Sequence, residues 1–101
     1  MVEKKRKIVW DINAKEQLQK IYLYIKEDSI SSAQKVKKEI LTTVSKLQEN
    51  PEIFPPDRFK RDNHGNYRAF EKHNYRIAYK NTDREIRILR IRHTGREPLE
   101  F

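Results

Sequence analysis

The amino-acid sequence predicts an α+β domain in which a helical hairpin packs on one face of a small, mainly antiparallel four-stranded sheet. Three observations support this prediction. The first half of the chain carries apolar residues at helical spacing, the second half alternates apolar and polar residues, and a segment with three prolines and a glycine separates the halves. The expected element order is β-α-α-β-β-β, and 101 residues fit a single domain over residues 1–101.

The first predicted elements are a strand and a helix. Residues 5–10 place basic residues before Ile-Val-Trp, and this composition predicts a short strand. Asn13 and Glu16 then have the spacing of a helix capping box. Apolar residues recur at helical spacing after this pair, so we expect an amphipathic helix over residues 14–28.

A second helix is expected after a short serine-rich break. Ser31 and Gln34 form another capping-box pair, and an apolar stripe continues from there to about Glu49. Two amphipathic helices joined by a tight turn form a helical hairpin. Asn50 and the proline after it end the second helix, and the prolines and glycine of residues 51–66 predict a loop.

The rest of the chain predicts three strands separated by polar turns. Residues 67–71 form the first strand, and residues 75–80 alternate apolar and polar side chains with the period of a half-buried strand. The third strand, residues 86–91, changes the phase of its apolar residues between Ile88 and Leu89. This change indicates either a β-bulge or a central strand with both faces partly covered.

The composition argues against several classes of site. The chain has no cysteine, which excludes disulfides, thiolate chemistry and cysteine-based zinc sites. His64, His73 and His93 do not have the spacing of metal ligands, and two glycines are too few for a phosphate-binding glycine loop. No apolar stretch has the length of a signal peptide or a membrane span. We therefore expect no metal, no cofactor, no membrane association and a cytoplasmic location.

Arginine is concentrated in the second half of this basic chain, whose net charge is +8. Nine of the ten arginines lie between Arg58 and Arg96, whereas lysine dominates the first half. Guanidinium groups bind phosphate or carboxylate through two hydrogen bonds and stack on bases. If the helices cover one face of the sheet, strand alternation leaves arginines on the other. The arginines expected there are Arg68, Arg76, and Arg90 or Arg92, with Arg96 directly after the last strand.

This open face, closed by the C-terminal tail, is expected to meet a negatively charged macromolecule. The alternative is a solvated strand face that serves solubility. A cluster of arginines with one titratable group is also able to cleave RNA without a metal, because the ribose 2′-hydroxyl is an internal nucleophile. The candidate catalytic residues are Arg68, Arg76, His93 and Arg96. His93 is the candidate proton shuttle, although a histidine at a strand end is more often structural.

Taken in succession, several segments resemble the RelE/ParE superfamily of bacterial toxin–antitoxin toxins. The segments are Tyr67-Arg68, Tyr75-Arg76-Ile77-Ala78-Tyr79, Ile86 to Ile91, and His93-Thr94-Gly95-Arg96-Glu97. The resemblance covers essentially the whole chain. It implies the toxin of an addiction module, which an acidic cognate antitoxin wraps and neutralises in a hetero-oligomer, and which arrests growth when it is freed.

The resemblance implies one of two activities. RelE-like members cut mRNA on the ribosome, and their pattern is only partly present. Arg68 stands for the first of two lysines, and Phe70 occupies the place of the second. Arg76 and Arg96 match the pattern, and Phe101 stands where a tyrosine is usual. In this alternative the protein is a metal-independent endoribonuclease, and His93 serves as the proton shuttle.

ParE-like members instead poison DNA gyrase and are not nucleases. Their last strand often ends in Arg-x-x-His, followed by a Gly/Arg-rich stretch and an acidic residue, as Arg90 to Glu97 does here. In this interpretation Arg90, Arg92 and Arg96 form a docking surface, and Tyr75 and Tyr79 belong to the core. We favour this activity slightly, because Phe70 and Phe101 lack groups that a nuclease uses.

A third hypothesis is a non-toxic module that binds single-stranded nucleic acid. An exposed sheet with arginines and aromatic side chains suits the stacking of bases. The residues expected to bind a target or nucleic acid are Arg68, Arg76, Arg90, Arg92, Arg96 and Phe101. Against this hypothesis, most of the aromatic residues of the strands fall on the phase expected for the core.

Overall fold

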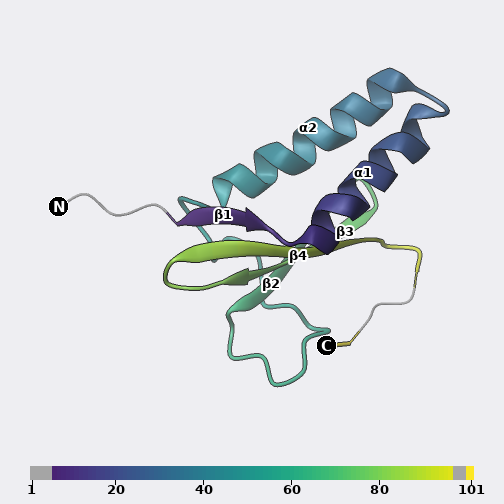
Figure 1. The fold of residues 1–101 in the computed structure, drawn as a ribbon. Coiled ribbons are helices and arrows are strands. Elements are labelled where there is room, and N and C mark those ends of the chain that lie inside the picture. The colour runs from purple at the N-terminus through teal and green to yellow at the C-terminus, as the bar shows by residue number, and fades with distance from the viewer. Residues whose placement is uncertain (1–5, 97–99) are drawn as a thin grey trace.

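The computed structural model describes residues 6–96 and 100–101 and has the predicted order of elements (Figure 1). The elements are β1 (Lys7–Trp10), α1 (Ile12–Lys26), α2 (Ile30–Lys46), β2 (Tyr67–Lys72), β3 (Tyr75–Asn81) and β4 (Glu85–His93). The strands form one sheet of order β1-β4-β3-β2, in which β1 runs parallel to β4 and the other pairs are antiparallel. The predicted fold class is therefore confirmed.

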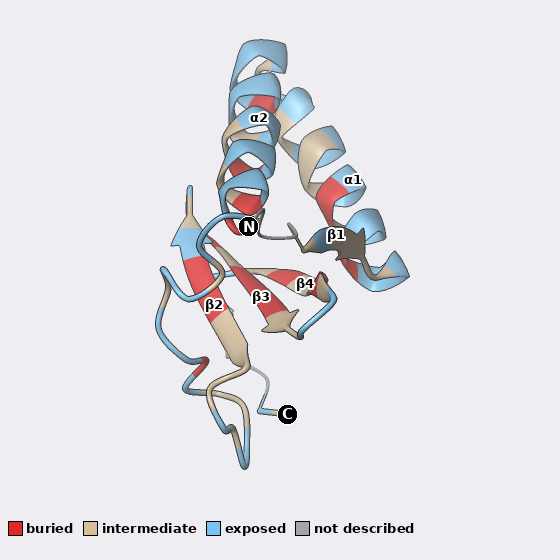
Figure 2. Cartoon of the chain, turned by 90° about the vertical axis from the view of Figure 1, so that its left-hand side faces the viewer, coloured by how far each residue is buried: buried red, intermediate tan, exposed pale blue. Residues whose placement is uncertain are grey.

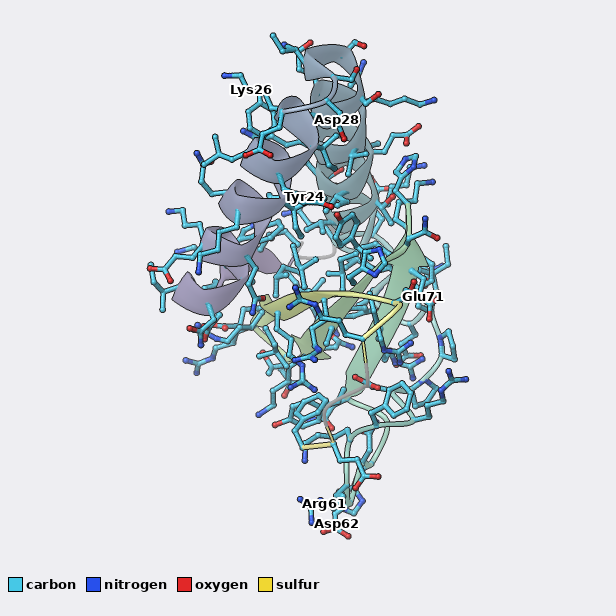
Figure 3. All side chains as sticks on the ribbon, turned by 90° about the vertical axis from the view of Figure 1, so that its right-hand side faces the viewer. Tyr24, Lys26, Asp28, Arg61, Asp62 and Glu71 are labelled. Carbon is cyan, nitrogen blue, oxygen red and sulfur yellow. The ribbon has the colours of Figure 1, made fainter. Side chains whose placement is uncertain are left out.

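The helical hairpin covers one face of this sheet and extends beyond it (Figures 1 and 3). The molecule is elongated, with extents of 46 × 32 × 21 Å. In Figure 3 the hairpin tip with Lys26 and Asp28 lies at one end, and the tip of the loop, with Arg61 and Asp62, lies at the other. The face of the sheet opposite the helices lies between these ends, and we call it the open face.

Each helix begins about two residues before its predicted capping box. The carboxylate of Asp11 accepts a hydrogen bond from the Asn13 N–H, and α1 begins at Ile12. The hydroxyl of Ser29 accepts from the Ser32 N–H, and α2 begins at Ile30. Both caps have extended backbone geometry, as N-caps require. The two predicted capping boxes were wrong, because an earlier side chain already satisfies the first free N–H groups.

The core lies between the helices and the sheet. Its largest fully buried side chains come from α2 and its C-cap and from the helix-facing positions of β3 and β4, and Figure 2 shows the buried segments of the helices and the sheet in red. Tyr75 and Tyr79 both belong to this cluster, as predicted. Burial of a side chain such as Ile77 or Ile88 stabilises the fold by about 1.5–3 kcal/mol. The Tyr79 hydroxyl donates to the Pro51 carbonyl at 2.9 Å, which ties the core to the start of the loop.

A β-bulge in β4 determines which arginines face outward. Ile88 pairs with Tyr79, but the next pair is Arg90 with Ala78, so Leu89 is an extra residue. The bulge explains the change of phase seen in the sequence. Ile88 and Ile91 both face the helices as a result, while Arg90 and Arg92 share the open face.

Candidate functional site

The open face brings together arginines from two adjacent strands. Arg76 of β3 lies directly opposite Arg92 of β4, and Ala78 lies opposite Arg90. The alternation of the two strands therefore places Arg76, Arg90 and Arg92 on the side away from the helices, so both Arg90 and Arg92, the two alternatives that the sequence offered in β4, lie there. Like charges directly across a strand pair repel each other. This arrangement requires nearby carboxylates.

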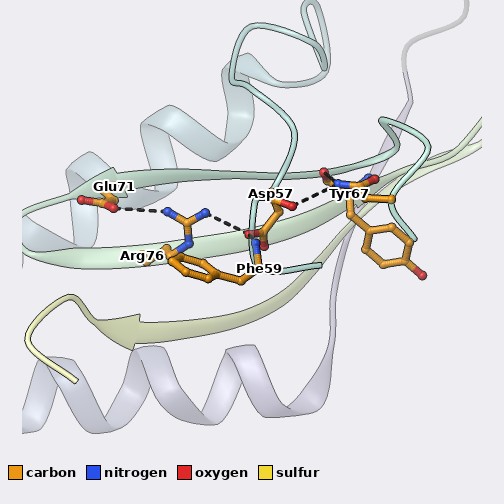
Figure 4. A network of polar contacts seen from close by, with 6 residues as sticks. Asp57, Phe59, Tyr67, Glu71 and Arg76 are labelled. Carbon is orange, nitrogen blue, oxygen red and sulfur yellow. Dashed lines mark hydrogen bonds and ion pairs between the residues drawn. The ribbon is translucent and has the colours of Figure 1, made fainter. Parts of the chain in front are cut away.

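Two carboxylates flank the Arg76 guanidinium (Figure 4). Its Nη2 donates to the Asp57 carboxylate at 2.9 Å, and its Nη1 donates to the Glu71 carboxylate at 3.2 Å. Asp57 is only 3% exposed. The same Asp57 oxygen accepts the Phe59 N–H at 3.0 Å, and the Asp57 N–H donates to the Tyr67 carbonyl at 2.8 Å. Arg76 is therefore held by a carboxylate that is itself fixed in the loop.

Aromatic rings of the loop and of the C-terminal residue lie against cationic side chains of the open face. The Phe59 ring contacts both the Arg58 and the Arg76 guanidinium, each 4.8 Å from the ring centroid. The Phe101 ring lies 3.9 Å from the Arg90 guanidinium carbon. Lys60 contacts the Phe101 ring as well, at 5.5 Å. The protein's own cations thus occupy these ring faces, each contact contributing about 0.5–1 kcal/mol where it is exposed.

Backbone hydrogen bonds fix Phe101 beside the loop. Its N–H donates to the Phe59 carbonyl at 3.0 Å, and its carbonyl accepts the Arg61 N–H at 2.5 Å. The expected closure of the face from the C-terminal side is seen for this residue. Glu97, the acidic residue of the ParE-like pattern, lies outside the described residues. Burial lowers the pKa of Arg90, the Asp57 carboxylate opposes this shift, and Arg92 and Arg76 reinforce it.

A cleft of about 80 Å³ remains on the open face near the end of β4. Its walls include Asp57, Phe59, Arg76, Arg92, His93 and Arg96. Pockets that enclose whole small-molecule ligands usually measure about 300–1,000 Å³. This cleft therefore has room for a phosphate-sized group or a few water molecules, but not for a whole nucleotide.

His93 lies at the edge of this cleft. Its Nδ1 accepts the Gly95 N–H at 2.9 Å, so the neutral ring carries its proton on Nε2. The ring packs edge-on against Tyr75, with the centroids 5.4 Å apart. A Cβ at Gly95 would lie 3.0 Å from His93 Nδ1, so glycine permits this close approach. The exposed Arg96 donates its N–H to the His93 carbonyl.

Arg68 does not lie on the open face, and this prediction was wrong. It pairs with Tyr79, a core residue, and so shares the helix-facing side of the sheet. Its guanidinium donates to the carbonyls of Gly65 at 2.9 Å, Phe54 at 2.6 Å and Glu52 at 3.4 Å. Arg68 therefore anchors the loop between α2 and β2. The error arose because the sequence does not specify the register of β2 against β3.

Sequence reasoning missed the acidic residues of the site. Asp57 lies in a loop whose conformation has no periodic signal, and Glu71 was expected only as the last residue of a strand, where the next turn begins. The available signal was the excess of arginine in this half of the chain, which requires carboxylate partners wherever arginines become buried. Within residues 6–96 and 100–101, no group of three or more histidine, aspartate or glutamate side chains is arranged to hold a metal ion. No helix in these ranges is long and apolar enough to cross a membrane.

Residues 8–98 match the family described as the ParE toxin of the type II toxin–antitoxin system parDE. The match spans most of the chain, so the protein belongs to this family and is a toxin of a type II toxin–antitoxin system. The resemblance to the RelE/ParE superfamily is thereby confirmed. No curated protein matches the chain significantly.

Two solved structures have a similar fold. A chain of the chromosomal ParDE toxin–antitoxin system from P. aeruginosa superposes with a TM-score of 0.68 at 22% identity, covering 88% of this chain and 96% of that one. A chain of the YoeB dimer from Staphylococcus aureus superposes with a TM-score of 0.59 at 20% identity, covering 89% of this chain and 98% of that one. At such low identity these similarities establish the shared fold.

Proposed function

We propose that this toxin arrests growth by poisoning DNA gyrase when it is released from its antitoxin. The observation that carries the proposal is the engagement of Arg76 by Asp57 and Glu71. A ribonuclease of this fold needs cations that are available to the phosphate in the transition state. Recruitment of Arg76 would leave Asp57 buried without its partner, which costs about 3–5 kcal/mol.

Other features of the structure also support a role without nuclease chemistry. Phe70 packs in the core against Phe54, and Phe101 is held against Arg90, so neither position offers a group that transfers protons. The cleft is too small to enclose a nucleotide. In our proposal Arg90 and Arg92 of β4, together with Arg96 beyond the end of this strand, form a surface that docks on the target protein.

The partner that restrains the toxin is, in our proposal, an acidic antitoxin encoded with it, and the two proteins form a hetero-oligomer in the cytoplasm. The net charge of +8 favours an acidic partner, because opposite charges accelerate association and select the correct complex. The P. aeruginosa structure, from a ParDE toxin–antitoxin system, has the same fold.

A ribosome-dependent mRNA endonuclease is the second candidate. His93 favours it, because this residue lines the cleft and the Gly95 N–H occupies its Nδ1, so Nε2 is the ring nitrogen left for proton transfer. A module that stacks single-stranded bases is less well supported. The rings it would use at Phe59, Tyr67 and Phe101 are already covered by arginine and lysine side chains.

Two assays on one preparation of freed toxin test the proposal. Purified gyrase with relaxed plasmid should lose supercoiling activity and accumulate cleaved DNA, while mRNA on translating ribosomes should stay intact. If mRNA is instead cut in phase with codons and the His93→Ala variant abolishes the cuts, the endonuclease is correct and the gyrase proposal is overturned.

A further inference from the structure

The open face contains both signs of charge, although the chain as a whole is strongly basic. The cleft is bordered by five arginines and by two carboxylates, those of Asp57 and Glu71. Both carboxylates lie against the same guanidinium, that of Arg76. The charge of Arg76 is therefore more than offset locally, although the five arginines leave the cleft as a whole with a net positive charge.

Asp57 is unable to release Arg76 easily. The carboxylate is 2% exposed, and the Phe59 N–H holds the same oxygen that Arg76 binds. The loop around it is paired to β2 through the backbone of Asp57 and Tyr67. The ring of Phe59 also lies on the Arg76 guanidinium. A phosphate that approached Arg76 would have to compete with a carboxylate already desolvated and in place.

We propose that Asp57 and Glu71 are specificity-determining residues that act as an anion filter. They withhold Arg76 from nucleic-acid phosphates and lower the affinity of the basic open face for polyanions. Weaker binding to cellular RNA and DNA leaves more of this basic protein unbound and available to its protein target. This benefit rests on the proposed function, whereas the effect of the two carboxylates on polyanion binding does not.

Isosteric substitutions test the filter. Asp57→Asn and Glu71→Gln each remove one negative charge and keep an oxygen that accepts the hydrogen bond from Arg76. The matched control is Glu16→Gln, an exposed position on α1 that changes the net charge equally. Fluorescence anisotropy with a labelled oligothymidylate measures affinity between about 50 and 200 mM salt, where phosphate contacts determine the slope.

Each substitution on the open face should raise the affinity about fivefold at about 0.1 M salt and steepen the plot of log K against log salt by about 0.7, the value for one additional phosphate contact on a single strand. Equal affinities and slopes for Glu71→Gln and Glu16→Gln would overturn the filter. Glu71 is half-exposed, so its variant remains informative even if Asp57→Asn unfolds. The assay contains no gyrase, and a steeper slope together with unimpaired gyrase would sustain the filter while refuting the proposed function.

Discussion

The Arg76 guanidinium and the Asp57 carboxylate form an ion pair 2.9 Å long between the start of β3 and the loop that precedes β2. They are 19 residues apart in the sequence. Asp57 is almost completely buried, whereas the Arg76 side chain is 21% exposed. The pair therefore has a structural role as well as an electrostatic one, and substitutions at its two ends should not have equal effects.

Arg76→Ala should destabilise the protein by about 3–5 kcal/mol, because it leaves the Asp57 carboxylate buried without a cation. Urea denaturation measures the free energy of unfolding. The double variant Arg76→Ala with Asp57→Asn should lose clearly less, since it leaves no buried charge. If the single and double variants lost the same free energy of unfolding, the ion pair would not be what holds the loop.

Arg68→Ala should loosen the loop, because the Arg68 side chain donates to three backbone carbonyls of residues 52–65. Hydrogen bonds from charged groups contribute about 1.5–3 kcal/mol, so a loss of about 2 kcal/mol is expected. Amide hydrogen exchange should accelerate in residues 51–66. Arg61→Ala, at the exposed tip of the same loop (Figure 3), is the control and should change neither quantity.

The two serines at the start of α2, Ser29 and Ser31, should differ in how much they contribute to stability. Ser29→Ala removes the cap on the Ser32 N–H and should cost about 1 kcal/mol. Ser31→Ala removes only a contact with the Ser29 hydroxyl and should cost much less. Thermal unfolding of the two variants compares them. A larger loss in Ser31→Ala would favour the capping box that the sequence suggested.

Alkaline pH should destabilise the fold through Tyr79. Burial raises the pKa of this phenol to about 12, from an ordinary value of 10.0. The folded state therefore retains a proton that the unfolded state loses, so stability is unchanged below about pH 10 and falls as the pH rises toward 12. In denaturation experiments across this pH range, the Tyr79→Phe variant should lose less unfolding free energy than the wild type. An unchanged slope would contradict the burial of the phenol.

The fold was predictable because its signals are local. Helical spacing, strand alternation and prolines predicted the element order. The change of phase at Leu89 indicated either a bulge or a central strand with both faces partly covered, and the structure shows the bulge. The caps were missed because several serine, asparagine and aspartate side chains near each helix start are equally suitable by type. Only the backbone geometry at Asp11 and Ser29 distinguishes them.

The site was less predictable, because it depends on strand register and on an irregular loop. The alternation of β3 predicted correctly that Arg76 lies on the open face. The register of β2 against β3 was unknown, so Arg68 was assigned to the wrong face of β2. The ion pair of Asp57 with Arg76 joins a loop to a strand, and no periodic pattern in the sequence predicts such a contact. The charge balance of the cleft therefore emerged only from the structure.

The proposed docking surface is tested most directly by titration of the freed toxin against gyrase supercoiling of relaxed plasmid. The wild type should inhibit supercoiling. Arg96→Ala should be strongly impaired, because it removes an exposed arginine of the cleft, whereas Arg84→Ala, an exposed arginine of the β3–β4 turn, should inhibit like the wild type. Full supercoiling in the presence of the wild-type toxin, or equal inhibition by Arg96→Ala and Arg84→Ala, would contradict the account.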